Sequence, residues 1–530
     1  MSFLFQTNLI SFRDLQLIAP ELILTVAACV ALVMEVILPY KLSKWTAYFS
    51  LTGVALAFLS LIAQFISMNG TFNLGALQNL SPIDGFYGMI RIDGFALVFQ
   101  AIFLIAAALA IAIAMKYLDI EREQHGEYYA LVLFATVGMM FLGSGYDLIS
   151  LYISLELMAV TFYVLVAFTK RERRSNEAGM KYFLLGAFSS GILIYGMSLL
   201  YGVAGSTNLG DIGRSVGAIT ATSPMRPMLL LGMIALAAGL FFKIAAVPFH
   251  MWAPDAYEGA PTSVTAFLST GSKAASFALY ARIFFVALAP MQIDWAPLLG
   301  IVAAITIVVG NWAAITQENS KRLLAYSSIS NAGYLLLGII ANNAYGNIGL
   351  VIYLLVYTLM NMGAFGVIIS LRRRGIIGDN VDDMTGLAHK APGMAAMMAI
   401  FMLSLGGLPA TGGFIGKWYL IGGVIQRGDA DHKSWYYWLA GWAVINIVVS
   451  FYYYIRFIRV MYLGDRIADE RPLTMSPALR TALVATLAGI LFIGVYPQPF
   501  IVLAQKLFPA QVAAPAASQA QPATPVEAPK

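Results

Sequence analysis

Five ionisable side chains lie inside long apolar stretches of the sequence: Glu156, Lys181, Lys243, Lys273 and Lys417. A charged side chain at the centre of a bilayer costs about 2.5–3.5 kcal/mol on insertion scales, so such residues are rarely kept without a function. A buried lysine loses the hydration of its ammonium form, and a nearby carboxylate restores that form. Moving the carboxylate away therefore favours proton release, and moving it back favours uptake. This pattern predicts proton translocation, with Glu156 paired with Lys243 or Lys181.

The other two lysines, Lys273 and Lys417, would extend the path through chains of water and hydroxyl groups. The expected hydroxyl groups lie in one apolar stretch, residues 322–341, and are those of Tyr326, Ser327, Ser328 and Ser330. A run of three tyrosines at 452–454 is expected to pack, or to lie at an interface, rather than to bind quinone.

Several charged or polar residues have a competing structural interpretation. Lys181 lies only a few residues inside its stretch and could extend its ammonium group to the membrane surface. Glu35, near the end of the first stretch, is expected at the interface, and Lys321 and Arg322 are expected as membrane anchors. His250 follows a proline, so it is either a structural histidine or a proton relay.

The elements that must position these residues are membrane helices. Of the 530 residues, 60% are hydrophobic and 11% charged, whereas soluble domains carry roughly 25% charged residues. Apolar runs of about 18 residues or more, each long enough to cross about 30 Å of hydrocarbon, follow one another along the chain. The sequence therefore predicts an all-α, polytopic transmembrane bundle of about 14 helices, with spans near 18–38, 46–66, 94–115, 129–145, 147–168, 178–203, 227–251, 262–289, 297–316, 322–341, 345–371, 392–426, 436–463 and 479–503.

Two of these spans combine a lysine with helix breakers. The seventh contains Lys243 and Pro248, and the twelfth contains Pro409, Gly413 and Lys417. Irregular backbone at membrane depth survives only where it borders protein or a water-filled cavity. The two spans are five apart, which predicts two inverted five-helix repeats with broken helices 7 and 12. The expected organisation is residues 1–128 for helices 1–3, 129–289 and 290–463 for the two repeats, 464–508 for helix 14 and 509–530 for a disordered tail rich in Ala and Pro.

Other features exclude several classes of protein. A single cysteine, Cys29, rules out a disulfide framework and a cysteine-ligated iron–sulfur cluster within the chain, and the four histidines are too scattered for a local metal motif. The net charge of +5 lies mostly in short loops, so it indicates topology and not nucleic-acid binding. Basic residues gather in the loops after odd-numbered helices, which places both termini on the outer side.

Long segments of the chain also resemble a known family. Residues 242–262 (FKIAAVPFHMWAPDAYEGAPT) and 319–334 (NSKRLLAYSSISNAGY) are similar to the antiporter-like, proton-translocating subunits of bacterial NADH-quinone oxidoreductase, respiratory complex I. The segments YEGAP (257–261), AGMKYFLLGA (178–187) and GSTNL (205–209) resemble the subunit N group within it. The resemblance extends from Pro20 to about Leu503.

This resemblance implies specific roles. Glu156, Lys243, Lys273 and Lys417 match the central axis of glutamate and lysines in the family, and Lys181 matches a further lysine of subunit N. Electrons would pass from NADH through FMN and iron–sulfur clusters to quinone in other subunits, with no cofactor or metal in this chain. The partners implied are membrane subunits A, H, J, K, L and M, the peripheral arm and the lipid of the bacterial inner membrane, with both termini periplasmic.

Two alternatives remain at this point. An Mrp-type cation/proton antiporter subunit would use the same lysines without a redox partner, although the YEGAP segment favours complex I. A scaffold subunit would keep turnover when the charges are removed. Within complex I, subunit M typically has glutamate where this chain has Lys417, and subunit L carries a long lateral helix. The departures from the family pattern are Ser272, where a proline often precedes the lysine, and the Ala/Pro-rich tail.

Overall fold

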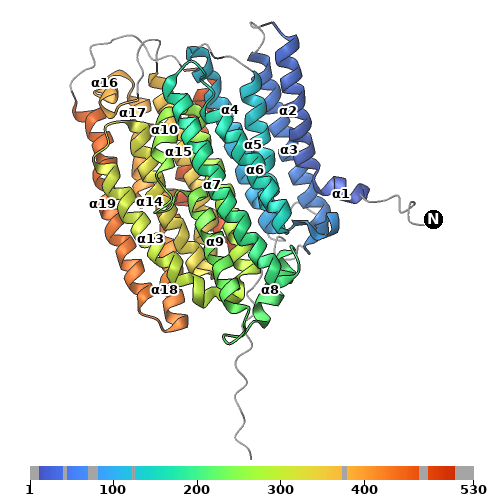
Figure 1. Ribbon diagram of the computed structural model, residues 1–530. Helices are drawn as coiled ribbons and strands as arrows, with labels where there is room; N and C mark the ends of the chain where they lie inside the picture. The colour runs from blue at the N-terminus through green and yellow to red at the C-terminus, as the bar shows by residue number, and fades with distance from the viewer. Residues whose placement is uncertain are drawn as a thin grey trace, which may run out of the picture.

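The computed structural model describes residues 11–39, 44–69, 81–121, 123, 126–372, 379–464, 475–505 and 507, so the predicted tail 509–530 lies outside the described residues. The helices stand side by side in one bundle (Figure 1). Their bounds are α1 Phe12–Leu17, α2 Ala19–Ile37, α3 Lys44–Asn69, α4 Gly94–Glu121, α5 Gly126–Ser144, α6 Leu148–Val166, α7 Arg173–Ala204, α8 Leu209–Ala218, α9 Arg226–Ile244, α10 Trp252–Gly259, α11 Thr262–Phe267, α12 Lys273–Arg282, α13 Gln292–Ile315, α14 Ser320–Ala341, α15 Ala344–Leu371, α16 Leu387–Lys390, α17 Pro392–Gly406, α18 Gly412–Asp431, α19 Trp435–Leu463, α20 Pro477–Val495 and α21 Gln498–Gln505.

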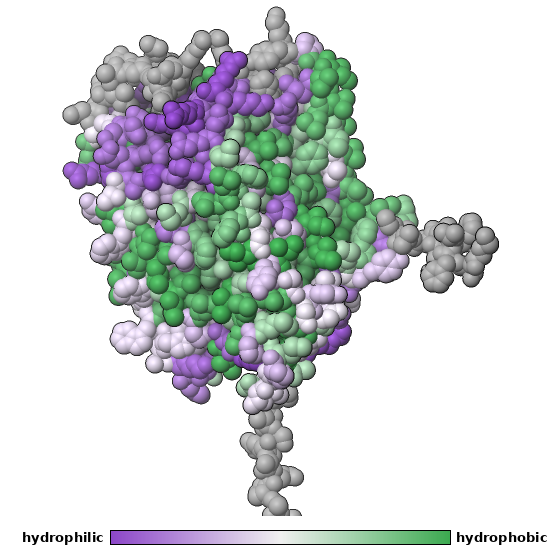
Figure 2. Space-filling model, viewed as in Figure 1, coloured by the Kyte–Doolittle hydropathy of each residue, from purple (hydrophilic) through white to green (hydrophobic). Residues whose placement is uncertain are grey.

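The all-helical membrane architecture is confirmed. Within the described ranges, 12 helices are long and apolar enough to cross a membrane. The other two predicted spans, 262–289 and 392–426, are interrupted: the first contains two π-helical segments, η4 (Leu268–Ser272) and η5 (Ile283–Ala287), and the second divides into α17 and α18. Hydrophobic residues cover the middle of the face shown in Figure 2, and hydrophilic residues gather at the end that carries α16.

Two predicted boundaries need correction. The seventh span was predicted to reach residue 251. In the structure it ends with α9 at Ile244, and the next residue, Ala245, adopts a left-handed conformation with φ 58°. The last span, predicted to reach 503, ends at Val495 because Tyr496 precedes a proline, and the residue before a proline is disfavoured in helical conformation. A separate short helix, α21, follows.

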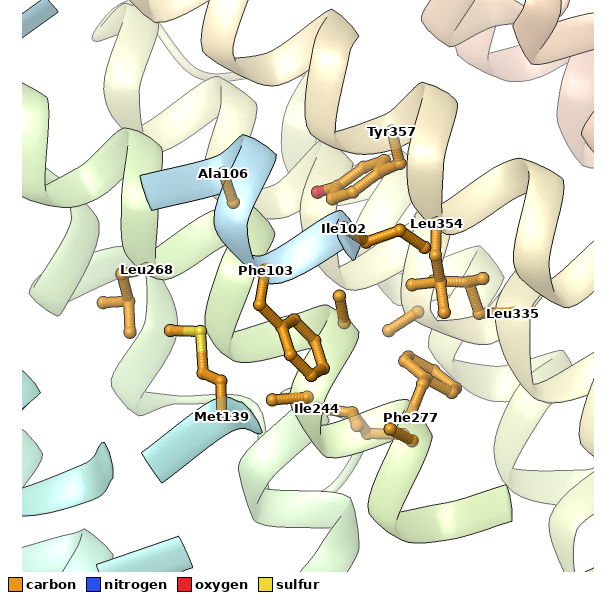
Figure 3. Packing of buried hydrophobic residues seen from close by; sticks show 14 of the residues in the cluster. Ile102, Phe103, Ala106, Met139, Ile244, Leu268, Phe277, Leu335, Leu354 and Tyr357 are labelled. Carbon is orange, nitrogen blue, oxygen red and sulfur yellow. The ribbon is translucent and has the colours of Figure 1, made fainter. Parts of the chain in front are cut away.

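The two central helices are α14 and α15, whose surfaces are almost entirely covered by other helices. The remaining helices surround them, and a small antiparallel hairpin of β1 (Ile83–Gly85) and β2 (Ile90–Ile92) lies at the opposite end from α16, beside the start of α8. Hydrophobic side chains from six helices meet in one core (Figure 3). They include Phe103 of α4, Met139 of α5, Ile244 of α9, Phe277 of α12, Leu335 of α14 and Leu354 of α15.

Candidate proton-transfer site

Glu156 and Lys243 come together through a third side chain, Ser190. The Ser190 hydroxyl donates to Glu156 Oε1 at 2.5 Å, and Lys243 Nζ donates to Ser190 Oγ at 3.4 Å. The three residues lie on α6, α7 and α9, and Lys243 is buried while Glu156 is partly exposed in the isolated chain. The predicted pairing of Glu156 with Lys243 is therefore an indirect one, bridged by a hydroxyl group.

The break after α9 positions Lys243 one residue before the end of the helix. A cation in the last turn of a helix is favoured by the helix dipole. The carbonyls of Phe241 and Phe242 already accept hydrogen bonds from the backbone N–H groups of Ala246 and Ala245. The Lys243 ammonium lies toward Ser190.

Lys273 follows the π-helical segment η4 and is buried. Its Nζ donates to both the carbonyl oxygen and the hydroxyl of Ser328 on α14, each at 2.5 Å. The same Ser328 hydroxyl lies 3.3 Å from the hydroxyl of Tyr257, and the Tyr357 ring lies 5.6 Å from the ammonium. π-Helical turns are frequent at functional sites because they shift one side chain out of helical register.

Lys417 lies on α18 and points back to the end of α17. Its Nζ donates to Leu405 O at 2.7 Å and Gly406 O at 3.3 Å, two of the carbonyls that a helix end leaves without an intrahelical partner. The break requires Gly407, whose φ of 91° is unfavourable for other residues. The ammonium also lies 4.8 Å from the ring centre of Tyr334 on α14.

Polar side chains of α14 lie between the two lysine sites. Ser328, at the Lys273 site, and Tyr334, at the Lys417 site, are six residues apart, which is about 9 Å along a helix. Between them, the Ser327 hydroxyl lies 2.5 Å from that of Tyr454, and the Tyr353 hydroxyl donates to Asn331 Oδ1 at 2.6 Å. These groups form a polar stripe of buried side chains.

The four hydroxyl groups that were predicted to extend the proton path do not all lie on this polar stripe. Ser327 and Ser328 lie on the polar stripe, whereas the buried hydroxyl of Ser330 has no hydrogen-bond partner and Tyr326 lies under Arg322. Of the tyrosine run, 453 and 454 are buried and 452 is exposed, as expected for packing.

Lys181 lies apart from Glu156, at the end of the bundle that carries α10 and α16. Its ammonium pairs with Asp255 at 3.0 Å and Glu177 at 2.9 Å, and its side chain is 46% exposed. Arg322 binds the same Asp255 carboxylate at 3.0 Å. Burial alone raises the pKa of Asp255, but hydrogen bonds from Lys181 and Arg322 outweigh it and hold that pKa below its ordinary value.

Contacts bear on three other expectations. Lys321 is buried, donates to Ala260 O at 3.0 Å and lies 3.6 Å from Asp379, so the interpretation as a membrane anchor is wrong for this residue. Glu35 accepts a hydrogen bond from the backbone N–H of Gly126 at 2.7 Å. The buried Nδ1 of His250 has no hydrogen-bond partner.

Three buried polar contacts were not predicted from the sequence. Ser190 and Tyr454 lie in apolar helices, and a lone serine or tyrosine there gives no signal of its contacts. The third is a buried ion pair in which Arg282, near the end of the interrupted span 262–289, binds Asp93 through two hydrogen bonds of 2.7 Å. An arginine inside a predicted apolar span could have been recognised from the sequence as a candidate buried charge. Among the described residues, no three His, Cys, Asp or Glu side chains gather to hold a metal ion.

Comparison with known proteins shows the same architecture elsewhere. A family model described as NADH:quinone oxidoreductase/Mrp antiporter, TM, matches residues 145–441. NADH-quinone oxidoreductase subunit N 2 of Solibacter usitatus is 53% identical over 430 residues, 81% of this chain and 85% of the relative. Subunit N 1 of Koribacter versatilis is 47% identical over 498 residues, 93% of this chain and 95% of the relative. A chain of respiratory complex I from Thermus thermophilus with bound aureothin aligns with a TM-score of 0.74 at 32% identity, over 92% of this chain and 99% of that one.

Proposed function

Because the chain belongs to the NADH-quinone oxidoreductase subunit N family, a membrane subunit of the proton-translocating enzyme, we propose that protons cross it by way of Glu156, Lys243, Lys273 and Lys417. The observation that carries this proposal is the bridged contact of Glu156, Ser190 and Lys243. It places a carboxylate, a hydroxyl and an ammonium group in one hydrogen-bonded line inside the membrane.

The bridged contact allows a balanced proton transfer. Lys243 Nζ gives a proton to Ser190 Oγ while the Ser190 hydroxyl gives its own proton to Glu156 Oε1. The products are a neutral amine and a neutral carboxylic acid, so no net charge is created in the low-dielectric interior. Movement of Glu156 would bias this exchange, because removing the carboxylate from the line favours release of the proton in another direction.

The lysines farther along the chain would continue the path. Lys273 and Lys417 lie on opposite ends of the polar stripe of α14, and waters between Tyr454, Asn331 and the lysines would join them. Lys181 would serve on the uptake side, since it lies with Asp255 at the end where basic residues gather. By the positive-inside rule that end faces the cytoplasm, which leaves both termini periplasmic in a bacterial inner membrane.

Redox coupling would reach this chain from outside. NADH, FMN, iron–sulfur clusters and quinone would bind other subunits, and the membrane subunits A, H, J, K, L and M would be the partners. Glu156 supports such contacts, because it is partly exposed beside the exposed apolar residues Ile153, Leu157 and Val160 of α6. A second subunit on this face would bury the carboxyl group and could move it.

The first experiment measures NADH-driven proton pumping and quinone reduction in membranes with Lys243→Ala, after assembly of the complex is confirmed. We expect both activities to fall together, because the lysine belongs to a coupled path. If both activities persist in the assembled complex, Lys243 has a structural role, and the result supports the alternative that this chain is a scaffold subunit. If ion exchange continues after quinone reduction is inhibited, the result supports the alternative that this chain is a cation/proton antiporter subunit.

A further inference from the structure

A second buried carboxyl group, Glu21, lies outside the proposed proton path. Glu21 is the third residue of α2, and its side chain is 1% exposed. Gln100 of α4, itself fully buried, donates through Nε2 to Glu21 Oε1 at 2.6 Å. The same Nε2 also donates to Met140 O of α5 at 3.4 Å. Two acceptors on one amide nitrogen fix the orientation of the Gln100 side chain.

Two buried atoms of this pair have no partner: Glu21 Oε2 and Gln100 Oε1. Buried polar atoms are nearly always hydrogen-bonded, so two unpaired atoms in one contact need an explanation. Both atoms are acceptors when Glu21 is ionised, and two acceptors cannot bond to each other. One proton on Glu21 Oε2 would turn that oxygen into a donor and complete a cyclic carboxylic acid–amide pair, in which each group donates once and accepts once.

The charges around Glu21 also favour the neutral acid. In α2, α3, α4 and α5, every other acidic or basic residue lies in the half toward α16: Glu35, Lys44, Lys116, Asp119, Glu121 and Glu127. At the hairpin end, Arg282 is already bound to Asp93 and to Gly143 O, Arg91 is bound to Asp84, and Asp14 of α1 accepts two backbone N–H groups. The N-terminal dipole of α2 favours a carboxylate only weakly, compared with the cost of burying an unpaired charge.

We propose that Glu21 is a proton-binding site separate from the lysine path, and that it holds one proton at neutral pH as the acid partner of Gln100. In this pair Glu21 Oε2–H donates to Gln100 Oε1 while Gln100 Nε2–H donates to Glu21 Oε1. The proton is bound between α2 and α4, at the end of the bundle opposite α16. This site does not depend on the proposed proton path and can exist whether or not that path operates.

Infrared difference spectroscopy on the purified complex tests the protonation state. Glu21→Gln replaces the neutral acid by an amide of the same shape that can make both hydrogen bonds, so the complex should assemble. The wild-type minus Glu21→Gln spectrum at neutral pH should contain the C=O stretching band of one carboxylic acid. Glu35→Gln is the matched control on the same helix, because Glu35 accepts a backbone N–H, and its replacement should leave the carboxylic-acid band unchanged.

A second variant covers the case in which Glu21→Gln fails to assemble. Gln100→Met leaves the acid in place but removes its amide partner, so the acid C=O band should move to higher frequency as the hydrogen bond is lost. Loss or change of a carboxylate band in either Glu21→Gln or Gln100→Met, with the acid region unchanged, would overturn the proposal.

Discussion

Replacing Ser190 by alanine would remove the only group that bridges Glu156 and Lys243 in the described hydrogen bonds. The hydroxyl donates to the carboxylate at 2.5 Å and accepts from the ammonium at 3.4 Å. The two charged groups are therefore at most about 6 Å apart, the two hydrogen-bond lengths laid end to end, and among the described residues they form no direct ion pair with each other. Direct proton transfer needs heavy atoms about 2.6–3.2 Å apart, so Ser190→Ala leaves a gap that no single proton transfer can cross.

The size of the effect follows from the two interactions involved. Charge attraction at about 6 Å with an effective dielectric constant of about 20 is roughly 3 kcal/mol, and this term survives the substitution. The 2.5 Å hydrogen bond to the carboxylate, worth about 1.5–3 kcal/mol, is lost, and the longer 3.4 Å contact contributes less. If that loss appears in the barrier to proton transfer, proton pumping should fall by about tenfold to a hundredfold. Ser190→Thr keeps the hydroxyl group and should retain most of the activity.

The assay is NADH-driven acidification by vesicles that contain the assembled complex, with quinone reduction measured in parallel. Ser189→Ala is the matched control, since Ser189 is the buried neighbour on α7 whose hydroxyl binds Gly239 O at 3.2 Å. It should pump nearly as fast as the wild type. Normal pumping by Ser190→Ala would refute the reasoning, and equal losses in both serine variants would point to packing instead of proton transfer.

Three further predictions concern other parts of the chain. Gly413→Ala should reduce assembly of the complex by several-fold, because the added Cβ would overlap backbone atoms of α17, whereas Gly441→Ala meets open space and should assemble normally by native gel electrophoresis. Lys181→Gln should slow pumping by less than about fivefold, since exposed ion pairs contribute only about 0–1 kcal/mol; a loss as large as that of a buried lysine would contradict its surface position. The hydrogen bond from Arg91 holds the pKa of Asp84 below its ordinary 3.8, so this ion pair stabilises the hairpin above that pH and is lost as the pH falls through the lower folded-state pKa. Proteolysis of the hairpin should therefore increase in the wild type as the pH falls below 3.8 and be raised at neutral pH in Asp84→Asn, and equal cleavage of both at neutral pH would show that the pair contributes nothing.

Membrane helices were predictable from the sequence because apolar length is a local property. The helix breaks were also predictable, since Pro248 and Pro409 remove backbone donors inside apolar runs. The residue at which a helix ends was harder to predict from the sequence. In α9 the helix stops four residues before Pro248, because Ala245 takes a left-handed conformation, which alanine rarely adopts. A boundary set by tertiary contacts cannot be read from local propensity.

The sequence predicted which types of residue form the candidate site, but it did not predict which residues they contact. Buried lysines are recognisable because charge in an apolar run is costly. Their partners are not: Ser190 and Ser328 are among many serines in the sequence, and only the packing of α7 on α9 and of α12 on α14 selects them. Lys321 shows the opposite error, since a lysine at a helix start has the pattern of a surface anchor and yet is buried beside Asp379.

The two helix breaks hold their lysines by different means, and this difference assigns a role to Glu156. At the end of α17, Leu405 and Gly406 leave their carbonyls free, and the Lys417 ammonium occupies both. At the end of α9, Lys243 belongs to the helix that ends, and its described acceptor is Ser190 Oγ, which in turn donates to Glu156. The charge on Lys417 therefore depends on backbone that cannot move without unwinding a helix. The contacts of Lys243 run through the side chains of Ser190 and Glu156, which can change rotamer, so we propose that the switch in this subunit lies at Glu156 and Lys243.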